Sequence, residues 1–163
     1  MSDSRELSIQ AIIGRMIKTE HRATFTDCDA YGHVSSARYL EMAINHRMSA
    51  VTEQLGIDTL HAAQNLSFAM VNKEVHLDFR SAAKFDDYLV IESWVEKIKR
   101  LRMTIHVRIS DKETGKVRCA LTIMSVAIDL ASELPCRLPD TFMPIEGVNP
   151  LILPWAPKHP KDV

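Results

Sequence analysis

The chain has 163 residues, of which 46% are hydrophobic and 25% are charged, and its formal net charge is -1. These values fit one globular domain and argue against a general nucleic-acid binder, because there is no basic excess to neutralise phosphates. Three cysteines without C-x-x-C spacing favour reduced thiols, no apolar run reaches the roughly 18 residues of a membrane span, and the N-terminus has no signal-peptide core. We therefore expect a cytoplasmic protein without a membrane span.

Residues 1–17 are predicted to form an amphipathic N-terminal extension. Its apolar residues follow helical spacing, which Gly14 weakens; they are Ile9, Ile12, Ile13, Met16 and Ile17. We expect this helix to pack on the domain or on a partner subunit. Binding to a membrane surface is the less favoured alternative, because the polar face is not notably basic. Residues 18–27 are predicted to form a strand.

One long helix is predicted from Ser35 or Ser36 to Leu55. A serine at the N-cap opens this helix, and Gly56 is placed to end it. Its apolar stripe comprises Leu40, Ala43, Ile44, Val51 and Leu55.

Four strands are predicted after the helix. Apolar and polar residues alternate in 75–80, 88–96 and 101–109, whereas 117–129 is apolar on both faces, as in a central strand. Residues 111–115 are expected to form a hairpin turn. One long helix followed by an antiparallel sheet predicts the α+β class.

The C-terminal part of the chain differs in composition from the rest. All seven prolines lie at or after Pro135, which predicts an extended arm over residues 135–163 and no second domain. The apolar centre of this arm, Leu151–Trp155, suggests that it docks on a surface. The predicted domain therefore covers residues 18–134, between the N-terminal extension and the arm.

The residues from Phe25 to Leu40, FTDCDAYGHVSSARYL, place two carboxylates, a thiol, a glycine and an imidazole at a strand-to-helix junction. A helix N-terminus favours anions and presents unpaired N–H donors. The pattern F-x-D-x-D-x-x-G-H-V-x-x-x-x-Y-L resembles the opening motif of the hotdog-fold acyl-CoA thioesterases of the 4-hydroxybenzoyl-CoA thioesterase type. This resemblance covers roughly residues 18–129. It implies an antiparallel sheet wrapped around one long central helix, and a homodimer or homotetramer with active sites between subunits.

The resemblance also assigns roles within the motif. Asp29 occupies the position of the catalytic carboxylate and would act as nucleophile or as general base, two routes that stay open. The alternative is that Asp29 only caps the turn. Asp27 would be an orienting residue that bonds backbone N–H groups, and Gly32 would supply a positive φ or a close approach of the backbone to substrate. The backbone N–H of Ser36 would polarise the thioester carbonyl.

The other side chains of the motif have competing interpretations. His33 could contact substrate or water, or it could bond a backbone carbonyl. A rival chemistry uses Cys28 as nucleophile with His33 as base, but the two flanking aspartates would raise the pKa of the thiol. Tyr39 and Leu40 are expected in the core.

Basic residues near the bend after residue 96 are candidates for binding the phosphates of coenzyme A. Lys99 and Arg100 match family positions, with Arg102 close by, although exposed cations at a hairpin are also typical of a solvated edge. The chain departs from its relatives at Asn45, where an acid is common, and at Arg80–Ala83, where a proline is common. No metal is expected. No cofactor is expected either, because coenzyme A is part of the substrate.

The sequence thus predicts an enzyme, an acyl-CoA thioesterase that releases a carboxylic acid and free CoA. An acyl carrier protein stays open as the thioester donor. Two alternatives are a hotdog-fold hydratase or dehydratase of acyl thioesters and a non-catalytic module that binds or senses acyl-CoA.

Overall fold

The computed structural model of the protein describes residues 16–55 and 68–138. Most of the predicted N-terminal helix, the Gly56 helix end and the arm beyond Leu138 lie outside these residues. The first four residues of the arm lie inside them and belong to the domain: Cys136 N–H donates to Ala127 O, Leu138 N–H donates to Arg100 O, and Leu138 is buried in the core.

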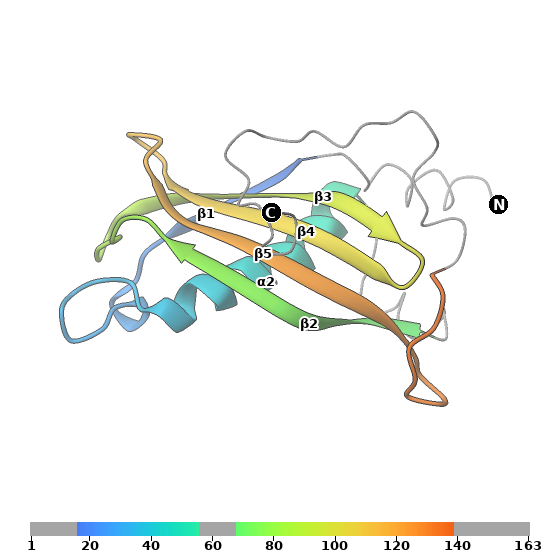
Figure 1. The fold of residues 1–163 in the computed structure, drawn as a ribbon. Helices are drawn as coiled ribbons and strands as arrows, with labels where there is room; N and C mark the ends of the chain where they lie inside the picture. The colour runs from blue at the N-terminus through green and yellow to red at the C-terminus, as the bar shows by residue number, and fades with distance from the viewer. Residues whose placement is uncertain (1–15, 56–67, 139–163) are drawn as a thin grey trace.

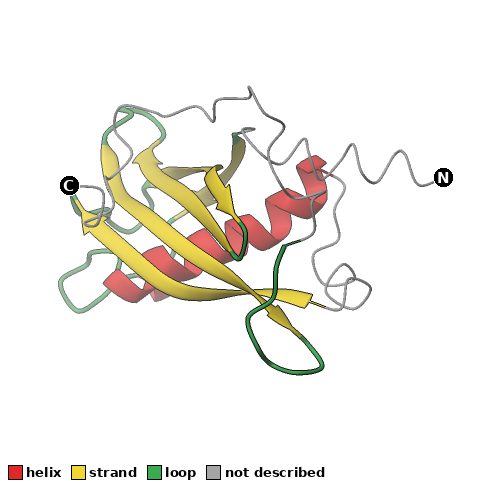
Figure 2. Ribbon diagram, turned by 45° about the vertical axis from the view of Figure 1, so that its right-hand side comes forward, coloured by secondary structure: helices red, strands yellow, loops and turns green. Residues whose placement is uncertain are grey.

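Five strands form one antiparallel sheet in the order β1-β3-β4-β5-β2, and helix α2 (Ser36–Leu55) crosses one of its faces (Figure 1). The strands are β1 (Ile17–Arg22), β2 (Phe68–Phe79), β3 (Tyr88–Lys99), β4 (Arg102–Asp111) and β5 (Val117–Asp129). Figure 2 shows the sheet curving around the helix. The predicted α+β layout is confirmed.

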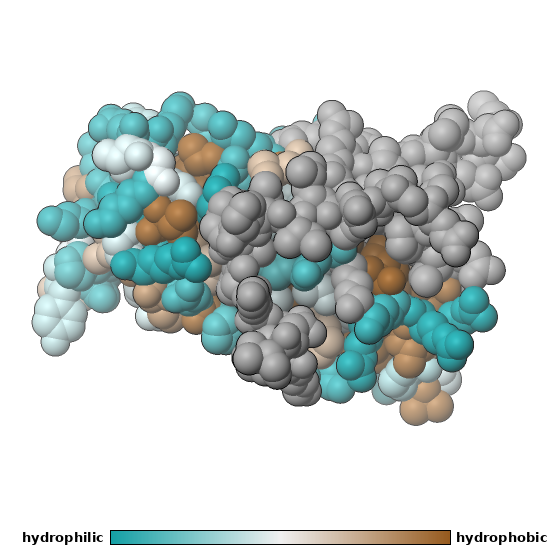
Figure 3. Space-filling view, turned by 45° about the horizontal axis from the view of Figure 1, so that its top comes forward, coloured by the Kyte–Doolittle hydropathy of each residue, from teal (hydrophilic) through white to brown (hydrophobic). Residues whose placement is uncertain are grey.

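The register decides which side chains face α2. Ser93, Val107 and Leu121 are paired across β3, β4 and β5, and all three are fully buried. Because neighbouring residues of a strand point to opposite faces, every second residue of these strands joins this core. On the part of the described surface visible in Figure 3, hydrophilic residues dominate and hydrophobic residues form small separate groups. No helix within the described ranges is long and apolar enough to cross a membrane.

Several predicted elements have the expected bounds. Helix α2 begins at Ser36 and β5 covers 117–129 as predicted. The turn after β4 is held by Asp111, whose Oδ1 accepts the N–H groups of Glu113 and Thr114, and Gly115 has a φ of +70°. Strand β2 begins at Phe68, well before the alternating residues that predicted it.

Two expectations were wrong. The first strand ends at Arg22, and not at residue 27, because Thr24 and Asp27 bond each other and close the short 3-10 helix η1 (Phe25–Asp27). The buried stripe of α2 also differs from the predicted one, because Ile44 is 38% exposed. The buried residues of this helix include Tyr39, Met42, Ala43, His46 and Ala50. Tyr39 lies in the core as predicted, and Leu40 packs partly buried against it.

Candidate active site

A tight turn between η1 and α2 carries Asp29. Its N–H donates to His33 O at 2.8 Å, and Gly32 N–H donates to Asp29 O at 3.0 Å. Gly32 has the predicted positive φ, +75°. Nothing lies within 4 Å of a Cβ added at Gly32, so the glycine serves the backbone conformation and not a close approach to other protein atoms.

The side chain of Asp29 is exposed, and one of its two oxygens is engaged. Oδ1 accepts the N–H groups of Tyr31 at 2.9 Å and of His33 at 3.2 Å. Within the described residues, Oδ2 has no hydrogen-bond partner. The carboxylate therefore holds the turn and still presents an oxygen to solvent, so the capping role does not exclude a chemical one.

Asp27 is buried and organises the same turn from behind. Its Oδ2 accepts hydrogen bonds from Thr24 N–H and Thr24 Oγ1, both at 2.8 Å, and lies 2.9 Å from His21 Nε2. Burial alone would raise the pKa of Asp27, but the hydrogen bonds from Thr24 and His21 outweigh it and bring that pKa below its ordinary value. The backbone O of Asp27 accepts Ser35 N–H at 2.9 Å, which joins the turn to the helix start.

The first backbone N–H of α2, that of Ser36, is free to donate a hydrogen bond to a ligand. Arg38 N–H bonds back to Ser35 O at 3.0 Å, whereas the amide of Ser36 has no acceptor in the described part of the chain. An unpaired N–H at a helix N-terminus, where the helix dipole is positive, is suited to a developing oxyanion.

His33 and Cys28 do not form a nucleophile–base pair in this structure. Cys28 Sγ lies 3.6 Å from Thr24 O, and the His33 ring has no hydrogen-bond partner among the residues described. Burial and the charges of Asp27 and Asp29 raise the pKa of the Cys28 thiol, as predicted.

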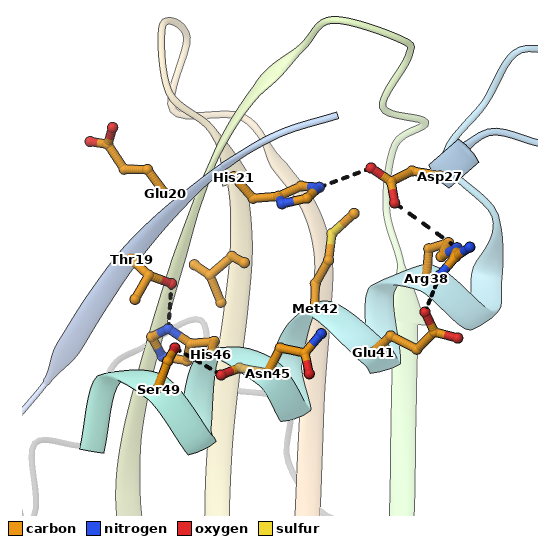
Figure 4. Close-up of a pocket in the computed structure, with 11 residues that line it drawn as sticks. Thr19, Glu20, His21, Asp27, Arg38, Glu41, Met42, Asn45, His46 and Ser49 are labelled. Carbon is orange, nitrogen blue, oxygen red and sulfur yellow. Dashed lines mark hydrogen bonds and ion pairs between the residues drawn. The ribbon is translucent and has the colours of Figure 1, made fainter. Parts of the chain in front are cut away.

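A cavity of about 220 Å³ lies between β1 and α2, behind Asp27 (Figure 4). His21 and Asp27 meet at its upper rim, and Arg38 reaches from α2 toward Asp27 Oδ1 at 3.9 Å while pairing with Glu41. Asp29 is not among its lining residues. The cavity is therefore bordered by Asp27, and Asp29 lies outside it.

His46 lines the same cavity and belongs to a buried network that links α2 to β1 and β3. Its Nδ1 is 2.6 Å from Thr19 Oγ1 and its Nε2 is 2.8 Å from Ser93 Oγ, which also accepts from Arg47. Burial, with a smaller contribution from Arg47, lowers the pKa of His46 to about 4.

Sequence reasoning did not find His21, Thr24 or His46. The spacing Thr24-x-x-Asp27 is a capping signal that the sequence offered, but it was hidden inside an expected strand. His21 and His46 become partners of Asp27 and Ser93 only in three dimensions.

The predicted phosphate-binding residues lie far from the motif within one protomer. Ala23 N–H bonds Asp87 O just before β3, whereas Lys99, Arg100 and Arg102 surround the turn after β3. Twelve residues of extended strand correspond to about 40 Å, and Figure 1 shows the two turns at opposite ends of the sheet. A single protomer does not bring them together.

The conformation of Gly32 gives a test of the turn. Gly32→Ala places a Cβ on a residue with positive φ, which should destabilise the protein by about 1 kcal/mol in urea unfolding. Gly115→Ala is the matched control, because Gly115 has a similar φ of +70° and equally open surroundings. Equal losses of stability are expected, with thioester turnover reduced only by Gly32→Ala; equal turnover in both variants would contradict a catalytic role for this turn.

Comparison with known proteins identifies the class. Residues 23–145 match the family model of the thioesterase-like superfamily. The acyl-CoA thioesterase YbgC of Haemophilus influenzae is 30% identical over 125 residues, covering 72% of this chain and 85% of its own. The long-chain acyl-CoA thioesterase FadM of Escherichia coli is 28% identical over 105 residues, covering 64% and 77%.

A solved structure shows the same fold. The 1,4-dihydroxy-2-naphthoyl-CoA thioesterase of Synechocystis superposes with a TM-score of 0.71 at 19% identity, covering 78% of this chain and 93% of its own. The predicted hotdog fold is confirmed. The chain belongs to the thioesterase-like superfamily. The prediction of a thioester hydrolase is confirmed with it.

Proposed function

We propose that the protein is an acyl-CoA thioesterase that uses Asp29 as its catalytic carboxylate. The observation that carries the proposal is the arrangement at the start of α2, where Asp29 exposes one carboxylate oxygen and the Ser36 amide has no acceptor in the described chain. A thioester carbonyl that accepts the Ser36 N–H would be polarised toward attack. The names of the sequence relatives support acyl-CoA as the substrate.

Two chemical routes fit this arrangement. In one, an Asp29 oxygen attacks the carbonyl carbon, the C–S bond breaks to release the CoA thiolate, and water hydrolyses the resulting anhydride. In the other, Asp29 takes a proton from water as the water oxygen attacks the carbonyl carbon, and the C–S bond then breaks to release the CoA thiolate, which takes up a proton. Asp27 would keep the turn in place in both routes, and His33 would lie at its edge.

We further propose a homodimer formed through the edge strand β2. This strand is 12 residues long and exposes Val75 (36%) and Phe79 (51%) on the face that carries α2. Two-fold antiparallel pairing of two such edges reverses one protomer end for end. The partner's Lys99–Arg102 turn then lies at the same end of the joined sheet as Asp29, which supports these cations as binders of CoA phosphates.

Dimerisation through β2 can be tested at Phe79. Phe79→Lys would place a charge on the apolar edge that the partner strand covers, and we expect the dissociation constant in sedimentation analysis to rise by at least about tenfold, or 1.4 kcal/mol. Phe85→Lys is the matched control, since Phe85 is 58% exposed in the connection between β2 and β3. An unchanged dissociation constant for Phe79→Lys would place the interface elsewhere.

The activity is tested by thiol release from a panel of short-chain, long-chain and aromatic acyl-CoAs. The aromatic thioesters test the finer resemblance to the 4-hydroxybenzoyl-CoA type. A second set of assays uses carrier-protein thioesters, because an acyl carrier protein could deliver the acyl group. Release from at least one substrate, without added metal or cofactor, is expected. Tight binding of acyl-CoA with no thiol release from either acyl-CoA or carrier-protein thioesters would refute the proposal.

We also propose that the protein is cytoplasmic. Its three cysteines are all free in the structure, which suits a reducing compartment.

A further inference from the structure

The connection between β2 and β3, residues 80–87, lies against the turn that carries Asp29. Val34 N–H donates to Ala83 O at 2.8 Å. The residue before Val34 is His33, whose backbone O accepts Asp29 N–H, also at 2.8 Å. A displacement of the connection would therefore move the backbone on which the Asp29 turn closes.

The same connection contacts the first turn of α2. Ala83 N–H donates to the hydroxyl of Tyr39 at 3.2 Å, and Tyr39 lies about one helical turn after Ser36. Val34, which bonds the carbonyl of Ala83, comes shortly before Ser36 in the chain. Ala83 thus bonds the chain on both sides of the amide that we propose to polarise the thioester carbonyl.

Arg118, near the start of β5, holds the connection in place. Its Nη1 donates to Ala82 O at 2.9 Å and to Ser81 Oγ at 3.4 Å. Its backbone O accepts the N–H groups of Arg80 at 2.9 Å and of Ser81 at 3.2 Å. Residues 80–87 contain no proline that would restrict the backbone covalently, so the path of the connection depends on hydrogen bonds of this kind.

Two carboxylates fix the direction of the Arg118 guanidinium. Nη2 donates to Asp111 Oδ2 at 2.9 Å and lies 3.5 Å from Asp87 Oδ2. Asp87 Oδ2 also accepts Lys84 N–H at 2.9 Å, so this ion pair leads back into the connection. Hydrogen bonds from Thr114 and Arg118 lower the pKa of Asp111 to about 2, which keeps its carboxylate ionised beside the guanidinium at neutral pH.

We propose that Arg118 is a positioning residue for the reaction, because it fixes residues 82–84 against the Asp29 turn. It thereby sets the place of the Asp29 carboxylate relative to the Ser36 amide. The inference rests on the proposed function and adds a side chain that acts through the backbone of the connection. A planar guanidinium meets both carboxylates and the Ala82 carbonyl at once, whereas a lysine ammonium cannot keep all of these contacts in the same geometry.

Arg118→Lys tests the proposal by kinetics. We expect kcat for the best acyl-CoA of the panel to fall about 10- to 100-fold with little change in KM, because a small misplacement of reacting groups slows the chemical step. Arg108→Lys is the matched control, since Arg108 of β4 donates two hydrogen bonds to Glu92 of β3. Its kcat should stay close to that of the wild type. Equal kcat values in the two variants would overturn the proposal.

Hydrogen exchange measures the positioning without turnover. In Arg118→Lys the Val34 amide should exchange at least about tenfold faster, because its acceptor, Ala83 O, lies in the released connection. The amide of Leu121, within β5, should exchange as in the wild type. Unchanged exchange at Val34, or equally faster exchange at both amides, would overturn the proposal. If the wild type released no thiol, the proposed function would fail, and exchange at Val34 would still decide whether Arg118 fixes the turn.

Asp87→Asn is a second, milder variant. The asparagine oxygen can still accept Lys84 N–H, but the negative charge that faces Arg118 is removed. We expect a loss of about two- to fivefold in kcat, as for one ion pair, together with faster exchange at Val34. Wild-type values of both quantities would overturn the proposal even if Arg118→Lys does not fold.

Discussion

Asp29→Asn is expected to reduce thioester turnover by about 10²- to 10⁴-fold, the usual contribution of a positioned acid or base. The asparagine keeps an oxygen that can accept the N–H groups of Tyr31 and His33, so the turn should survive. It removes the negative charge needed either to attack the carbonyl or to take a proton from water. Thiol release from the best acyl-CoA of the panel measures the effect.

Cys28→Ser is the matched neighbour for this experiment. The Cys28 thiol has a raised pKa and bonds Thr24 O instead of the His33 ring, so near-wild-type turnover is expected. Loss of turnover in Cys28→Ser with retention in Asp29→Asn would replace the carboxylate mechanism with a cysteine acyl-enzyme.

Acidification should destabilise the protein through His46. Its pKa is about 4 in the folded state, against an ordinary value of 6.5, so below pH 6.5 the unfolded chain binds the proton that the folded chain excludes. Stability is therefore fully present above pH 6.5 and is lost as the pH falls toward 4. Between pH 7.5 and 5 the loss should be about 2 kcal/mol, at 1.4 kcal/mol per pH unit.

Urea unfolding at the two pH values measures this loss, and His46→Gln is the variant to compare. Glutamine can still donate to Ser93 Oγ but does not titrate, so its stability should change little over this range. The buried Asp27 has a lowered pKa and titrates at more acidic pH, outside the range. A wild-type loss that persists undiminished in His46→Gln would assign the acid sensitivity to other groups.

Short sequence patterns correctly predicted those parts of the fold that depend on interactions between neighbouring residues. The start of α2 at Ser36 and the bounds of β5 follow from a serine cap, a turn around Asp111 and a continuous apolar run. The turn that carries Asp29 was found through the resemblance of residues 25–40 to a known motif, and its glycine and carboxylate lie within five residues of each other.

The missed features depend on contacts between residues far apart in the chain. From the sequence, His46 is only a polar residue within a helix. Its buried partners, Thr19 and Ser93, lie far away in the chain and cannot be predicted from residue periodicity. Ile44 is apolar but exposed, because the face of α2 that it occupies is not the one that meets the sheet. Strand β2 was predicted too short because its first half lacks clean alternation.

The irregularity in that first half of β2 affects how the edge can associate. The pairing of β2 with β5 shifts between Asn72 and Glu74, and the Asn72 side chain accepts a hydrogen bond from Ser125 at this point. A bulged strand twists and interrupts its row of free N–H and C=O groups. An uninterrupted edge of 12 residues would offer a template for fibril growth. The shift divides the edge into two shorter regular segments, 68–72 and 74–79, so neither is a long uninterrupted template for stacking.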